Sequence, residues 1–197
     1  LYFVAIERMY VGVALLIEFT APIWILVFLR FVLKKHVPSA FWYAILLALG
    51  GLLMITQIWN GLAIDRIGLM AAFFDAFCLA GYFLIGDHLS KTKSSGAISV
   101  WGFGVASLGL LFFFPIWDYP FEALSKDMNL LGVFEGQTLP GWVLVLWIII
   151  MGTVAPYLFV LAGLKLLSAS TASVFGMIEP VLAGMIAWWW LNESLNG

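Results

Sequence analysis

Six apolar stretches, each long enough to cross a lipid bilayer, dominate the sequence and limit the folds that it can adopt. A membrane-spanning helix needs about 20 mostly apolar residues. The stretches that meet this requirement are Val11–Leu33, Ala40–Trp59, Ile67–Leu89, Ala97–Trp117, Pro140–Leu164 and Ser170–Leu191. They are continuously apolar, unlike the alternating strands of a membrane barrel. The chain is 64% hydrophobic and only 10% charged, whereas a soluble domain is about a quarter charged. We therefore predict an all-α, polytopic transmembrane helix bundle.

Lysines and arginines set the predicted orientation of the bundle, because cytoplasmic loops carry an excess of them. If the spans alternate in direction, one side of the membrane receives six of these residues: Arg30, Lys34, Lys35, Lys91, Lys93 and Lys165. The other side receives three: Arg8, Arg66 and Lys126. We assign the richer side to the cytoplasm. The polar loop 118–139 is then outside, and the aromatic triplet Trp188–Trp190 lies at the outer interface, where such rings are favoured.

Two segments of the chain share an order of features, although few of their residues are identical. Shifted by 158 residues, segment 5–37 lies over segment 163–195 without a gap. Each has an apolar helix end, a short turn, a start rich in small residues, a carboxylate before a mid-span proline, and a polar end. The first ends in Lys34-Lys35 and the second in Asn192-Glu193, so the predicted orientation places their ends on opposite sides. Inverted repeats with interrupted helices are typical of secondary transporters.

The second of these segments carries a recognisable combination of motifs. It has a small-residue entry at Gly163–Ala172, the pair Glu179-Pro180 inside the helix, and a polar end at Leu191–Leu195. In this combination the chain resembles the EamA family of the drug/metabolite transporter superfamily. The resemblance implies ten helices in two inverted five-helix repeats. It also implies transport, often export, of small metabolites such as amino acids or related compounds, or of drugs, by alternating access.

Laid on this ten-helix plan, the chain covers helices four to nine. Residues 1–59 would form the C-terminal part of the first repeat, with the end of helix three and helices four and five. Residues 67–197 would form the second repeat, with helices six to nine and helix ten missing. We therefore expect a fragment that is truncated at both ends.

Six residues are candidates for a substrate or proton pathway. They are Glu179, Pro180, Glu18, Pro22, Asp75 and Tyr157. A carboxylate inside the membrane is costly and usually faces a pathway, and a proline within a span frees a backbone carbonyl. If the three carboxylates share one cavity, their mutual repulsion would favour proton binding, which would suit proton coupling.

Several of these candidates also have a purely structural interpretation. Glu179 could bond a neighbouring helix and serve packing alone. Asp75 adjoins the alanines at every fourth position from Ala72 to Ala80, a small-residue ladder typical of helix packing in membranes. Its carboxylate could be satisfied at that contact. Tyr157 could pack against a neighbour or belong to an interfacial belt.

Composition argues against other functions. The net charge of −2 argues against a nucleic-acid partner, the single Cys78 excludes an internal disulfide, and the isolated His36 and His88 lack metal-ligand spacing. We find no phosphate-binding glycine loop and no nucleophile–base pair, so we expect no cofactor, no metal and no enzymatic activity. A structural or assembly subunit and a membrane-embedded enzyme are the rival interpretations. We predict a multi-pass protein of the bacterial plasma (inner) membrane that binds a small-molecule substrate within the lipid bilayer, and a homodimer is left open.

Overall fold

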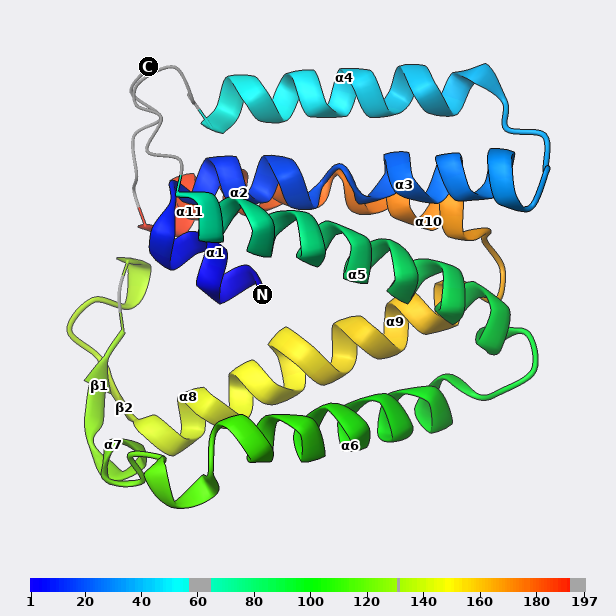
Figure 1. Ribbon diagram of the computed structural model, residues 1–197. Helices are drawn as coiled ribbons and strands as arrows, with labels where there is room; N and C mark the ends of the chain where they lie inside the picture. The colour runs from blue at the N-terminus through cyan, green and yellow to red at the C-terminus, as the bar shows by residue number, and fades with distance from the viewer. Residues whose placement is uncertain (57–64, 131, 192–197) are drawn as a thin grey trace. The chain divides into compact units, whose positions relative to one another are not determined.

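The computed structural model describes residues 1–56, 65–130 and 132–191. The chain divides into two compact units. The first joins Leu1–His88 to Leu167–Gly184, and the second joins Leu89–Leu166 to the segment that begins at Met185. Helices make up most of both units (Figure 1), which confirms the predicted all-α class.

Five helical segments of the described chain are long and apolar enough to cross a membrane. They are Val11–Val32, Arg66–Ser90, Ser95–Phe113, Gly141–Gly163 and Ala169–Trp190. These segments correspond to five of the six predicted spans and confirm a polytopic membrane bundle. The other predicted span, Ala40–Trp59, is occupied by α4 (Ser39–Thr56), and its last three predicted residues lie outside the described residues.

The fourth span ends earlier than predicted. Its helix, α6 (Ser95–Phe113), stops at Phe113 and not at Trp117. The cause is Pro115, because a proline disfavours the helical conformation at the residue before it. A short 3₁₀ turn, Ile116–Asp118, follows. The helix also begins earlier than predicted, since the Ser94 side chain caps it by accepting the Ala97 N–H at 3.2 Å.

The loop predicted as polar, 118–139, contains short elements that the sequence did not predict. They are α7 (Glu122–Ser125), β1 (Asp127–Asn129), the 3₁₀ turn Gly132–Phe134 and β2 (Thr138–Pro140). The two strands pair antiparallel, with Met128 opposite Leu139. Strands of three residues are too short to show the alternating pattern from which a strand is predicted.

The turn of this hairpin packs against Trp190, at the end of α11 (Glu179–Leu191). The Trp190 ring meets the Phe134 ring edge to face, with 5.1 Å between their centroids. Gly132 has a left-handed φ of +70°, and a Cβ added there would overlap the Trp190 carbonyl oxygen. Trp188 and Trp189 are exposed, as an interfacial belt requires. Trp190, in contrast, packs against the hairpin.

Gly132→Ala is expected to destabilise the second unit by about 2 kcal/mol, because a side chain there adds left-handed strain and a clash with Trp190. Gly136 is a matched control: its φ is +90°, but a Cβ there meets open space. Gly136→Ala should therefore cost only the conformational part, about 1 kcal/mol. Thermal unfolding of the purified protein in detergent would measure both. Equal losses would show that Trp190 does not contact the turn.

The rest of the second unit is a pair of packed spans. The fifth span runs as α8 (Gly141–Trp147), a π-helical stretch (Ile148–Val154) and α9 (Ala155–Gly163). Pro156 lies in the first turn of α9, where its missing N–H interrupts the bonding pattern at the end of the π stretch. α9 packs against α6.

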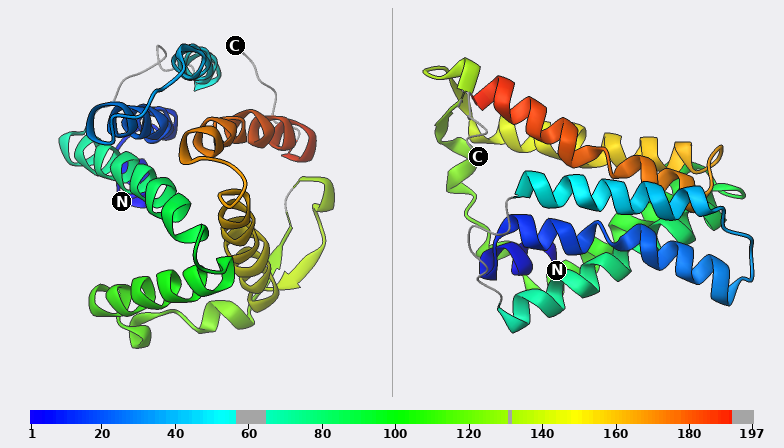
Figure 2. Two further views of the ribbon diagram at one scale, coloured as in Figure 1. Left: turned by 90° about the vertical axis from the view of Figure 1, so that its right-hand side faces the viewer. Right: turned by 90° about the horizontal axis from the view of Figure 1, so that it is seen from above.

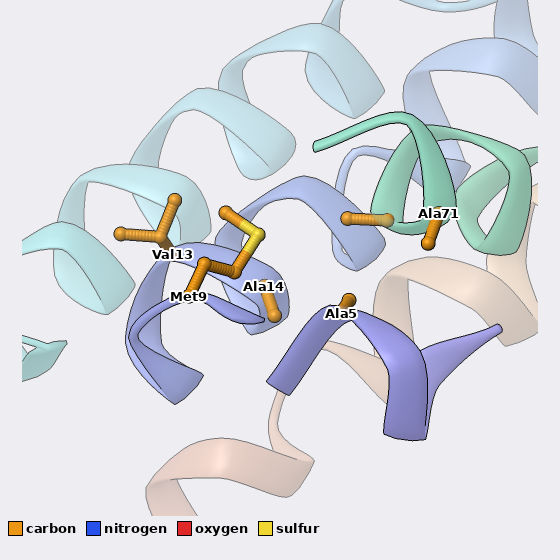
Figure 3. Packing of buried hydrophobic residues seen from close by; sticks show 6 residues of the cluster. Ala5, Met9, Val13, Ala14 and Ala71 are labelled. Atoms are coloured by element: carbon orange, nitrogen blue, oxygen red, sulfur yellow. The ribbon is translucent and has the colours of Figure 1, made fainter. Parts of the chain in front are cut away.

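In the first unit, α2 (Val11–Glu18) and α3 (Ala21–Val27) lie between α4 and α5 (Arg66–Ser90), as Figures 1 and 2 show. α1 (Tyr2–Arg8) joins α2 and α5 in a cluster of small apolar side chains (Figure 3). Its buried members are Ala5, Met9, Val13, Ala14, Ala71 and Ala72. Small side chains let these helix backbones approach closely, which is how membrane helices pack.

The alanine ladder of α5 is the packing face that the sequence predicts. Ala72, Ala76 and Ala80 are all buried, with 2%, 0% and 4% of their surface exposed. Ala80 belongs to a second cluster, which also contains Ala21 of α3. The ladder therefore holds α5 against the helices that precede and follow the break in the first span.

Candidate functional site

The first membrane span is broken near its middle. α2 ends at Glu18 and α3 begins at Ala21, so a turn at Phe19-Thr20 separates them (Figure 1). Pro22 lies in the first turn of α3, where the missing N–H of a proline costs little. In a continuous helix that N–H would bond the Glu18 carbonyl, so Pro22 removes the usual donor to this group.

Thr20 makes polar contacts at this break, and the sequence patterns did not single it out. Its hydroxyl donates to the Ile17 carbonyl oxygen at 2.6 Å and accepts the indole N–H of Trp24 at 3.3 Å. The Trp24 ring stacks in turn on Phe77 of α5, with 4.5 Å between the ring centroids. These contacts satisfy polar groups where the helical bonding lapses. The sequence signal that could have identified Thr20 is its position two residues before a mid-span proline.

The last span is broken at the corresponding residues. α10 (Ala169–Gly176) is followed by the turn Met177-Ile178 and then by α11, whose second residue is Pro180. Adding 158 to the bounds of α2, 11 and 18, gives 169 and 176, which are the bounds of α10. Adding 158 to 21, the start of α3, gives 179, the start of α11. The 158-residue shift that aligns the two segments of the sequence thus also aligns the helix boundaries at the two breaks.

The two breaks meet in one apolar cluster of the first unit. Met177 is buried there together with Leu26 and Ile45, and Phe19 packs against the same cluster. Phe19 and Met177 are corresponding residues of the two breaks, since 19 + 158 = 177. α3 also packs against α10. The breaks are therefore neighbours, held together by apolar contacts and by α4.

The three predicted carboxylates lie around this pair of breaks. Glu18 is the last residue of α2, Glu179 is the first residue of α11, and Asp75 lies within α5. Asp75 and Glu179 are close enough to Glu18 for their charges to act on it. Tyr2 of α1, which was not predicted, lies in the field of the same three carboxylates.

The burial of these groups differs. Glu18 and Asp75 are half-buried, Pro22 is buried, and Glu179 is exposed. Among the described residues, no three His, Cys, Asp or Glu side chains are arranged to hold a metal ion. Carboxylates inside a membrane usually face a pathway, and such a role for these three residues stays a prediction.

Pro180 lines a groove of about 370 Å³ beside the break in the last span. Its walls are residues of α4, α10, α11 and the turn between α10 and α11, and all of them are apolar or glycine. Gly51 of α4 and Val174, Met177 and Val181 of the broken span are among them. None of the three carboxylates lies on this wall, so the groove and the carboxylate site are separate features of the first unit.

Tyr157 lies in the second unit. Its ring meets Phe103 of α6 edge to face, with 5.2 Å between the centroids, and 42% of its surface is exposed. This contact belongs to the packing of α9 against α6. A role for Tyr157 in a pathway stays a prediction.

Comparison with known proteins identifies a family of membrane transporters. Residues 66–197 match the EamA-like transporter family. The chain is 26% identical to the "Uncharacterized transporter YwfM" of Bacillus subtilis (strain 168), with 100% of this chain and 62% of that protein aligned. It is 24% identical to the "Uncharacterized transporter YdfC" of the same strain, over 92% of this chain and 55% of that protein.

The chain thus spans less than two thirds of the length of these two curated relatives. No solved structure matches it. The family match covers α5 to α11, which is more than half of the sequence and includes the second broken span with Glu179 and Pro180. The chain therefore belongs to the EamA-like transporter family, whose members are multi-pass membrane transporters.

Proposed function

We propose that the protein is a secondary-active carrier that works by alternating access. The observation that carries this proposal is the meeting of two spans broken at corresponding residues, with Glu18 on one side of its break and Glu179 on the other. Discontinuous helices that meet near the middle of the membrane form the substrate and ion sites of many secondary transporters. In this proposal the two halves rock against each other around the carboxylate site.

The charge of the site indicates the chemistry of its ligand. Glu18, Asp75 and Glu179 bring three acidic groups together, so the site favours a proton or a substrate with a cationic group such as an ammonium. Amino acids, related amines and cationic drugs carry such a group. We propose export of a small metabolite or drug of this kind, driven by proton exchange.

The domain organisation and location follow the same proposal. Residues 1–59 would belong to the first inverted repeat and residues 67–197 to the second. The family match, which begins at residue 66, supports this division. The first compact unit contains helices of both proposed repeats, α2–α4 from the first and α5 and α10 from the second. We place the carrier in the bacterial inner membrane, with the lysine-rich loops in the cytoplasm.

Reconstitution of the full-length protein into proteoliposomes tests the proposal. We expect accumulation of at least one amino acid, amine or cationic drug when a pH gradient is imposed, and loss of that accumulation when a protonophore collapses the gradient. Protein-free liposomes and an unrelated reconstituted membrane protein serve as controls. A flat signal across a broad panel, with or without a gradient, would contradict the carrier function.

A further inference from the structure

A second cavity of the first unit lies at the connection between α3 and α4, and none of the three carboxylates lines it. Figure 1 shows the course of the chain from α3 to α4. The cavity has a volume of about 730 Å³, within the range of sites that hold small ligands. The residues that line it are Arg30, Phe31, His36, Val37, Pro38, Ser39 and Trp42. They come from the π-helical end of the first span (Phe28–Val32), the connecting turn and the start of α4.

This cavity is basic and has no internal counter-charge. Arg30 and His36 are on its wall, and Lys34 and Lys35 are their neighbours in the chain. The sequence from Phe19 to Ile64 contains no Asp or Glu. Within the described part of the chain, Arg30 and His36 form no ion pair or side-chain hydrogen bond. Their donors are therefore available to an anion.

The turn that forms the cavity has a fixed shape. Lys34 is the one described non-glycine residue with a positive φ, 51°. The Lys35 N–H donates to the Leu29 carbonyl at 2.9 Å, so the turn folds back on the π-helical end of the first span. A left-handed non-glycine residue is uncommon. This turn brings His36 and the first turn of α4 to the wall that Arg30 occupies.

The start of α4 adds hydrogen-bond donors and apolar surface. Ser39 lines the cavity at the start of α4. The first backbone N–H groups of a helix have no partner within the helix and attract negative charge. Phe31 and Trp42 supply aromatic surface beside these donors. A cavity lined by both basic and aromatic side chains, at the ends of two membrane helices, matches a ligand with an anionic head and an apolar body.

We propose that this cavity binds the headgroup of an anionic phospholipid. Arg30 and His36 would contact the phosphate, and Phe31 and Trp42 would contact the glycerol backbone and the upper acyl chains. Basic pockets at the cytoplasmic ends of membrane helices bind anionic lipid headgroups in this way. A soluble anion would gain the charge contacts and none of the aromatic ones. The site is independent of the carboxylates and holds a lipid whatever substrate the carrier transports.

The test is lipid titration of the purified full-length protein in detergent, followed by native mass spectrometry and thermal unfolding. Phosphatidylglycerol should bind and raise the unfolding temperature, and phosphatidylcholine should do so much less. The double variant Arg30→Gln, His36→Gln should bind phosphatidylglycerol about 10-fold more weakly. Arg30→Lys keeps the charge, so it should retain part of the affinity.

Lys93→Gln combined with Lys165→Gln is the matched control. Both lysines belong to the predicted cytoplasmic side and neither lines the cavity, so this variant removes two charges and should bind phosphatidylglycerol like the wild type. The unfolding temperature of each variant without lipid shows whether it is folded. Three results would each overturn the proposal: equal affinity for the two lipids, unchanged affinity in the Arg30/His36 variant, or equal protection by soluble glycerol phosphate.

Discussion

Replacing Glu18 with glutamine is expected to lower transport driven by a pH gradient about 100-fold, while the protein inserts and folds normally. Glutamine keeps the size of the side chain and one of its two acceptor oxygens, and it removes the charge that can bind a proton or an ammonium group. Loss of one contact to a charged group in a desolvated site costs about 2–3 kcal/mol, which is about 100-fold in an equilibrium constant. Glu18 is the carboxylate on which both other carboxylates act.

The transport assay can also separate the two roles that a carboxylate could have. Exchange of labelled for unlabelled substrate across the liposome membrane needs substrate binding and no net proton movement. If Glu18 binds only the proton, Glu18→Gln should abolish accumulation and retain exchange. If it binds the substrate, both should be lost. Glu179→Gln and Asp75→Asn, measured in the same way, assign a role to each carboxylate.

Glu7→Gln is the matched control for these variants. Glu7 lies on α1 in the same unit and is exposed, and its side chain forms no hydrogen bond or ion pair with the described residues. Removing its charge should leave accumulation and exchange at wild-type levels. If Glu18→Gln accumulates substrate at the wild-type level, with equal protein incorporation, Glu18 is not part of the transport pathway.

Much of the fold could be predicted from the sequence, because a bilayer imposes a strong constraint on composition. Each span must be apolar over about 20 residues, and Val11–Val32 and Gly141–Gly163 lie within a few residues of their predicted bounds. The hairpin of β1 and β2 was not predicted, because it lies in a polar loop and its strands of three residues are too short to show a sequence pattern. The predicted end of α6 lies four residues beyond its actual end at Phe113, because the apolar run continues past the proline that stops the helix.

The broken spans were partly visible in the sequence. Pro22 and Pro180 mark both breaks, and the 158-residue shift aligns them. The position of each turn was not predicted, because a proline is tolerated in the first turn of a helix as well as at a kink within one. Only the structure shows that the helix stops at Glu18 and restarts at Ala21.

The grouping of the candidate residues depends on tertiary packing, and the pattern of a single sequence does not show which helices pack together. Asp75 is one residue from the buried Ala76, so the same pattern predicts a packing face and a site. The structure shows both: the alanines pack, and the carboxylate acts on Glu18. Tyr2 lies in the field of the three carboxylates, but the sequence did not predict this. A tyrosine at the edge of an apolar run is equally typical of an interfacial anchor.

Ala80→Leu is expected to destabilise the first unit by about 3 kcal/mol and to lower the yield of folded protein. Ala80 is 4% exposed and shares a buried cluster with Ala21, Ile25 and Ala169, so three added carbon atoms must push α5 away from α3 and α10. Ala106→Leu is the control, because Ala106 is an exposed residue of α6, where the same side chain would meet lipid. Both alanine and leucine are strong helix formers, so the difference between the two variants reports packing alone. Thermal unfolding in detergent measures it. Equal stability of the two variants would show that the alanine ladder does not hold α5 against the broken span.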